Sequence, residues 1–151
     1  MPLKVHPVEV GLALALVLSI ALTGCGPSAA TKKAAEQQTS NLKALARAFG
    51  QYSGQHRGQL PPGEPELKEF VRSLTPEARD GKDADALFVS ERDGKPYVIL
   101  FGDLNGPPGP GGFPVCMYEQ EGKNGKRIVA STVGATEEVD EARFKQLVPG
   151  K

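Results

Sequence analysis

The stretch ALFVSERDGKPYVILF, residues 86–101, decides the fold that this sequence predicts. It holds two runs rich in β-forming residues, 86–91 and 96–101, on either side of Arg-Asp-Gly-Lys. An Asp-Gly pair between two such runs is a strong signal of a β-hairpin. In the run 96–101 both alternating faces are apolar, which is typical of a central strand covered on both sides. We therefore expect an antiparallel sheet with 96–101 near its centre, covered by the chain's own helices.

The same pattern returns later in the chain. Two further β-prone runs, 115–121 and 127–133, are separated by a turn signal, Asn-Gly, at 124–125. Asp140 is a suitable N-cap for a short last helix. The apolar residues of that helix are Phe144, Leu147 and Val148. The sequence therefore predicts four strands followed by a C-terminal helix.

Two helices are predicted before the strands. The first begins at Lys32 or at Ser40, and two glycines, Gly50 and Gly54, weaken and end it. The second covers 65–74, with a proline in its first turn. The first helix has an apolar stripe of Leu42, Leu45, Phe49 and Tyr52, and a polar face of Asn41, Lys43, Arg47 and Gln51. The order of elements predicts an α+β fold in which the N-terminal helix packs on a small antiparallel sheet of about four strands.

The N-terminus has the layout of a secretory signal. A polar start leads into an apolar run at 11–22, and small residues follow just before Cys25. A membrane-spanning helix needs about 20 apolar residues, and this run is shorter. The four residues LTGC resemble a bacterial lipobox, in which the cysteine thiol receives a diacylglyceryl group. We expect lipid on Cys25, and we expect the processing enzymes to read Leu22, Thr23 and Gly24.

Lipidation defines the expected organisation of the chain. Residues 1–24 are then a signal peptide, 25–39 a lipidated N-terminus and stalk, and 40–151 an α+β globular domain. One acyl chain binds a bilayer only marginally, whereas two or three hold firmly. The expected location is the cell envelope, on a membrane and facing the periplasm or the exterior. Gly26, where an Asp would retain the protein at the inner membrane, favours the outer membrane. We expect no cofactor beyond this lipid.

Composition argues against several classes of function. The 18 basic and 18 acidic residues balance, so the charge footprint of a nucleic-acid-binding protein is missing. After signal cleavage one histidine remains, His56, which lies in a polar loop. The sequence has no zinc-ligand spacing. Cys116 lies in a predicted strand, where a free thiol behaves as a small buried hydrophobe. We therefore predict no catalytic residue, no metal site and no enzyme, with a hydrolase built around His56 as an alternative.

The segment GDLNGPPGPGGFP, residues 102–114, is rich in glycine and proline. It is expected as a stiff, exposed loop that joins the two hairpins. Asp103 and Asn105 resemble the opening of a calcium loop, although a proline follows at position 107 and the terminal Glu is missing. An alternative function is therefore an envelope lipoprotein that binds a small ligand, a peptide or calcium through Asp103 and Asn105.

Three stretches of the chain resemble one family of bacterial proteins. They are NLKALARAFGQYSGQHRGQLPP at 41–62, LFVSERDGKPYVILFG at 87–102 and YEQEGKNGKRIVASTVGATEEVDEARFKQL at 118–147. Together they cover most of 40–148 and are similar to the helix, proline-containing loop and sheet of pseudopilin-type proteins, especially small envelope lipoproteins related to prepilins. The resemblance implies a non-enzymatic head that contacts an envelope protein partner, in a secretion or pilus-type assembly. The chain departs from prepilins because a lipobox replaces their cleavage site and long apolar helix.

Overall fold

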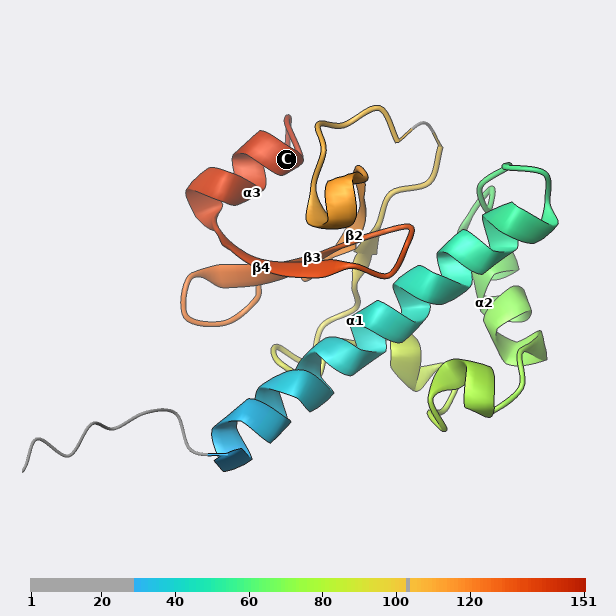
Figure 1. Cartoon of the computed structure of the whole chain (residues 1–151), viewed down its shortest axis with the longest axis horizontal. Helices are drawn as coiled ribbons and strands as arrows, with labels where there is room; N and C mark the ends of the chain where they lie inside the picture. The colour runs from blue at the N-terminus through green and yellow to red at the C-terminus, as the bar shows by residue number, and fades with distance from the viewer. Residues whose placement is uncertain (1–28, 103) are drawn as a thin grey trace, which may run out of the picture.

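The computed structural model describes residues 29–102 and 104–151 (Figure 1). Its helices are α1 (Ala29–Gln55), α2 (Glu64–Ser73) and α3 (Glu141–Leu147), and its strands are β1 (Val98–Ile99), β2 (Val115–Tyr118), β3 (Lys126–Ser131) and β4 (Thr136–Asp140). The strands form one antiparallel sheet in the order β1-β2-β3-β4. The predicted α+β class is confirmed. The predicted lipidation and processing residues, and Asp103, lie outside the described residues.

The sheet is covered on both faces by the chain itself, as predicted. Figure 1 shows α1 on one side of the sheet and α3 on the other. Along β1 the side chains alternate between the two layers: Ile99 packs into the core around α1, and Val98 packs into the core around α3. The second cover is α3, the short C-terminal helix. Two separate hydrophobic cores therefore hold the sheet.

The predicted strand at 86–91 is wrong. Residues Ala86–Phe88 form a 3-10 helix, and only one antiparallel bridge, Val89 to Pro96, joins the two predicted partners. The Asp83 side chain explains the turn, because its Oδ1 accepts hydrogen bonds from two successive backbone N–H groups, at 2.9 and 3.1 Å. The helical turn also buries the adjacent residues Leu87 and Phe88. Consequently β1 has no full strand beyond it and forms an edge of the sheet, where we expected the centre.

The other edge strand, β4, was missed by the sequence analysis. Its sequence TEEVD carries three acidic residues and reads as a polar connector, yet it pairs with β3 from Lys126–Asp140 to Ala130–Thr136. Charged side chains are common on edge strands because they discourage pairing with other chains. The Asn-Gly turn between β2 and β3 is confirmed, with φ values of 54° and 71°. The Asp140 cap of α3 is also confirmed, since its Oδ1 accepts from the Arg143 N–H at 2.8 Å.

The long helix α1 is the centre of the fold. It begins at Ala29, before both predicted starts, and it continues past Gly50 and Gly54 to Gln55. Asn41, expected on the polar face, is buried, and its Nδ2 donates to the carbonyl oxygens of Ala86 and Val89 at 3.2 and 3.3 Å. No helix in the described part of the chain is long and apolar enough to cross a membrane.

Gly50 is a contact point and not a helix stop. A Cβ atom at this position would lie 2.0 Å from the carbonyl oxygen of Thr132, in the turn between β3 and β4. A Cβ atom at Gly54, in contrast, would meet nothing within 4 Å. The missing side chain at residue 50 therefore lets α1 approach the end of the sheet.

We predict that Gly50→Ala destabilises the protein by about 1–3 kcal/mol, because overpacking forces the backbone of α1 away from the sheet. The measurement is the free energy of unfolding in urea. Gly54→Ala is the matched control, since the same substitution in open space at a helical position costs nothing and adds helix propensity. Equal stability of the two variants would show that α1 does not touch the turn.

Candidate functional site

The Gly/Pro-rich segment borders two hollows, which meet at residues 101 and 104. The first has a volume of about 340 Å³ and lies between the start of this segment and the C-terminal residues 147–151. The second has a volume of about 510 Å³ and lies between 101–104 and the loop 58–62. Asn105 lines the first hollow, so the structure brings one of the two predicted loop residues to a concave surface.

The walls of the first hollow are mainly apolar. Leu100, Leu104, Val115 and Leu147 contribute side chains, and Asn105 is polar. Calcium takes six to eight oxygen ligands. Across residues 29–102 and 104–151, no group of three or more His, Cys, Asp or Glu residues could hold a metal ion. The described residues therefore suit an apolar ligand or a peptide side chain better than a cation.

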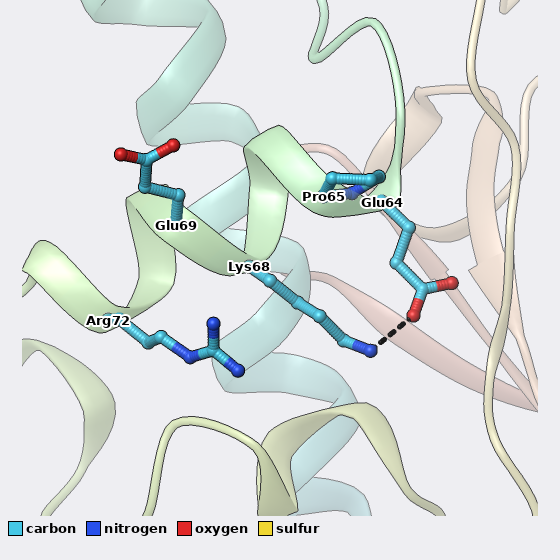
Figure 2. A pocket seen from close by; sticks show the side chains of 5 residues that line it. All are labelled: Glu64, Pro65, Lys68, Glu69 and Arg72. Carbon is cyan, nitrogen blue, oxygen red and sulfur yellow. Dashed lines mark ion pairs between the residues drawn. The ribbon is translucent and has the colours of Figure 1, made fainter.

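A third hollow, with a volume of about 760 Å³, follows one side of α2 (Figure 2). Its lining is mostly charged, and the ammonium of Lys68 lies 2.6 Å from the Glu64 carboxylate, one helical turn earlier. The Lys68 ammonium also lies 5.2 Å from the ring centroid of Phe88. Arg72 pairs with Asp85 at 2.7 Å. Glu64, Lys68 and Arg72 are therefore already paired within the chain.

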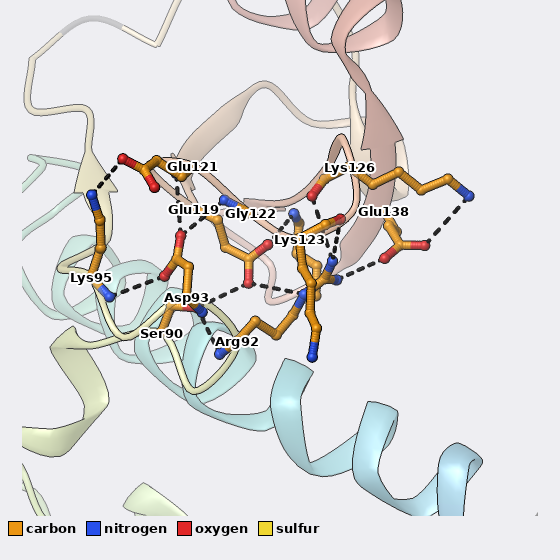
Figure 3. Close-up of polar contacts among 11 residues, drawn as sticks. Ser90, Arg92, Asp93, Lys95, Glu119, Glu121, Gly122, Lys123, Lys126 and Glu138 are labelled. Carbon is orange, nitrogen blue, oxygen red and sulfur yellow. Dashed lines mark hydrogen bonds and ion pairs between the residues drawn. The ribbon is translucent and has the colours of Figure 1, made fainter.

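A largely buried polar cluster surrounds Glu119 (Figure 3). Glu119 directly follows β2 and is fully buried. Its Oε2 accepts from the Ile128 N–H at 2.8 Å, and its Oε1 accepts from the Ser90 hydroxyl at 3.0 Å. Arg92 Nε lies 3.5 Å from Oε1, and the same guanidinium donates to Glu138 at 2.7 Å. The cluster therefore joins the loop after the 3-10 helix to β3 and β4.

Asp93 ties the same loop to the β2–β3 turn. Its Oδ2 accepts from the backbone N–H groups of Gly122 and Glu121, at 2.9 and 3.2 Å, and its Oδ1 accepts from Lys95 N–H at 3.0 Å. Burial alone would raise the pKa of Asp93, but these three hydrogen bonds outweigh it and lower that pKa. Asp93 is thus held as a carboxylate that organises backbone.

Burial has the opposite net effect on Glu119. It raises the pKa of the carboxyl group, and the hydrogen bond from Ile128 and the positive charge of Arg92 only partly oppose it. Tyr97 lies in the same buried region, and its hydroxyl has no hydrogen-bond partner among the described residues. Burial, followed by the negative charge of Glu119, raises the pKa of Tyr97. The Glu119 carboxyl group is enclosed, and its partners offset part of the cost of holding a charge away from water.

The two residues considered for nucleophilic or acid–base chemistry have structural surroundings. His56 is exposed, stacks on Tyr52 with ring centroids 3.9 Å apart, and places its Nδ1 2.8 Å from the Tyr52 carbonyl oxygen. Cys116 is fully buried, as predicted, with its sulfur 3.5 Å from the Ala130 carbonyl oxygen. Burial raises the pKa of the Cys116 thiol to about 12, so at neutral pH it is not a thiolate nucleophile.

The sequence analysis missed the Glu119 cluster. One signal was present: in the run 115–121, strict alternation places Glu119 on the same side as Val115 and Met117, which are both apolar. A carboxylate on an apolar face predicts a buried, partnered acid. The identity of its partners, Ser90 and Arg92, depends on a loop that the sequence predicted as a strand and a turn.

Comparison with known proteins adds no relative: no family model, no curated protein and no solved structure matches the chain at a significant level.

We predict that Glu119→Gln changes how stability depends on pH. The folded-state pKa of Glu119 is raised above its ordinary value of 4.5. The contribution of protonated Glu119 to the free energy of unfolding is therefore complete below pH 4.5, and it is lost as the pH rises through the raised pKa. Glutamine does not ionise, so the variant gains stability relative to the native chain as the pH increases from about 4.5. Urea unfolding at a series of pH values measures this difference. A constant difference would contradict the prediction.

Proposed function

We propose that this protein is a lipid-anchored component of the bacterial cell envelope that acts through contact with another protein. The observation that carries the proposal is the sequence Leu-Thr-Gly-Cys, which ends at Cys25, four residues before α1 begins at Ala29. An acyl group on Cys25 would place a membrane at the start of a helix whose later half, from Asn41 to Phe49, is built into the core.

The shape of α1 supports a role as both spacer and core element. A helix of 27 residues is about 40 Å long. Figure 1 shows its first turns extending beyond the sheet. With lipid on Cys25, this part of α1 holds the globular domain away from the bilayer surface. A domain held in this way presents its sheet and loops to proteins of the same compartment.

We also propose that the globular domain is pseudopilin-like. The support is the arrangement of one long N-terminal helix packed along a small antiparallel sheet, together with the resemblance of 41–62, 87–102 and 118–147 to that family. A structural or interaction role suits this arrangement, because the Glu119 and Asp93 carboxylates and the Cys116 thiol serve the fold. The outer membrane is the proposed location.

We predict that Cys25→Ser abolishes lipid attachment. In cells fed a palmitate analogue, the native chain becomes labelled, and its mature N-terminal peptide carries the mass of an acylated cysteine. The serine variant gains no label and accumulates as unprocessed precursor, because serine lacks the thiol that forms the thioether. Cys116→Ser is the matched control and keeps its label. A mature N-terminus at any residue other than 25 would refute the anchor.

A second candidate function is ligand binding at the first hollow. The specific observation in its favour is that Asn105, chosen from the sequence, lines a concave and mainly apolar surface. The ligand would be a small apolar molecule or a peptide. If the Asp103 carboxylate also contributes to the site, calcium is a third candidate ligand.

We predict, on this second reading, that calorimetry with calcium or with short apolar peptides detects binding heat that Asp103→Ala or Asn105→Ala removes. Gln51→Ala, an exposed polar residue on α1, is the control that keeps the heat. Heat that survives both loop substitutions would place binding elsewhere. The absence of heat with every probe would leave protein contact as the function.

A further inference from the structure

The outer edge of β1 is only partly paired. In an antiparallel ladder, successive residues direct their backbone groups to opposite sides. Val98 pairs with Tyr118 and Leu100 N–H donates to the Cys116 carbonyl at 2.8 Å, so these residues face β2. The residues between and after them, Ile99 and Phe101, therefore direct their N–H and C=O groups away from the sheet.

The chain covers the first part of this edge and then leaves it. Tyr97 N–H donates to the Phe88 carbonyl at 3.0 Å, and Val89 bridges Pro96. The 3-10 helix Ala86–Phe88 then turns away, for the reason given above. From Ile99 onward, the described residues provide no hydrogen-bond partner for the outward backbone groups.

Phe101, at the end of the open part of the edge, lines the 510 Å³ hollow. Phe101 and Leu104 form one wall of this hollow, and the loop 58–62 forms the other. That loop contains Pro61 and Pro62, which have no backbone N–H and so do not complete a strand ladder with the edge. The end of the sheet edge therefore borders a hollow, and the loop on the other side of the hollow does not pair with the edge.

The edge is also held rigidly in place. The side chains of Ile99 and Phe101 pack into the core around α1, and the rings of Phe101 and Phe49 lie 6.3 Å apart between centroids. The second edge, β4, differs because its outward surface carries Glu137 and Glu138, which oppose pairing. Of the two sheet edges formed by residues 29–102 and 104–151, the β1 edge combines packed edge residues with a hollow at its end, beside Phe101.

We propose that the β1 edge at Ile99–Phe101 binds an extended peptide segment of a partner protein as an added strand. Backbone donors and acceptors at alternate positions are complementary to another extended backbone, and strand addition is an established mode of peptide recognition. Leu60, Phe101 and Leu104 in the walls of the hollow would contact apolar side chains of the bound segment. This inference deepens the proposed function by naming the class of partner, and it rests on that proposal only for the expectation that a protein is the partner.

The test is backbone hydrogen exchange of the full chain in nonionic detergent, read residue by residue by NMR. The probe is a six-residue peptide of alternating Thr and Val, acetylated and amidated, at millimolar concentration. In the free protein we expect fast exchange at Ile99 and Phe101 and slow exchange at Leu100, which is already bonded to Cys116. With the peptide, exchange at Ile99 and Phe101 slows by about tenfold or more, while the outward amides of β4 do not change.

The control is the same peptide with the backbone nitrogen of every residue methylated, which removes its backbone N–H donors. It should bind about tenfold more weakly or not at all. The proposal is overturned if Ile99 and Phe101 are protected without peptide, if the peptide changes nothing, or if both peptides protect equally. Protection that grows with protein concentration would show a second copy at the edge and would also overturn it. The exchange assay does not require lipid. A negative result in the exchange assay therefore leaves the Cys25 experiment unaffected, and a negative result in the Cys25 experiment leaves the exchange result unaffected.

Discussion

The close approach of α1 to the sheet is the constraint on which the rest of the structure depends. Small side chains make it possible: Ala44, Ala46 and Ala48 are all buried, and Gly50 brings the helix backbone against Thr132. A helix surrounded in this way needs small residues on several of its sides, and one apolar stripe is not enough. The positions of α2, of the 3-10 helix at 86–88 and of the β3–β4 turn all follow from where α1 lies, because each contacts it.

A second constraint is the buried charge of Glu119. Removing a carboxylate from water is costly, and the protein offsets that cost with Ser90, Arg92 and the Ile128 N–H. These partners come from a loop and a strand that are far apart in sequence. The cluster therefore makes the loop after the 3-10 helix part of the sheet assembly, although that loop contributes only one bridge to the β-structure. Specific polar contacts attach this loop to the sheet, as strand pairing attaches the neighbouring strands to one another.

Local signals predicted the fold class, α2, the Asn-Gly turn, the Asp140 cap and the burial of Cys116, because each depends on a few neighbouring residues. Three features depend on distant ones and were not predicted. The strand expected at 86–91 is a helical turn that depends on the nearby Asp83 and also on the distant Asn41, and the acidic strand β4 is defined by its pairing with β3. Gly50 reads as a helix breaker until the Thr132 carbonyl is placed beside it. Of the candidate site, the sequence indicated Asn105, but the hollow itself is formed with the C-terminal residues 147–151.

The continuity of α1 has a mechanical consequence. The helix runs without a break from Ala29 into the core, where it contacts β2, β3, β4, α2 and the 3-10 helices Glu77–Arg79 and Ala86–Phe88. A pull at its N-terminal end acts along the helix axis, so it loads these contacts in shear, all at the same time. Contacts loaded together resist force better than contacts that are peeled apart one after another. The element that enters the fold first in sequence is thus also the one best placed to carry tension through it.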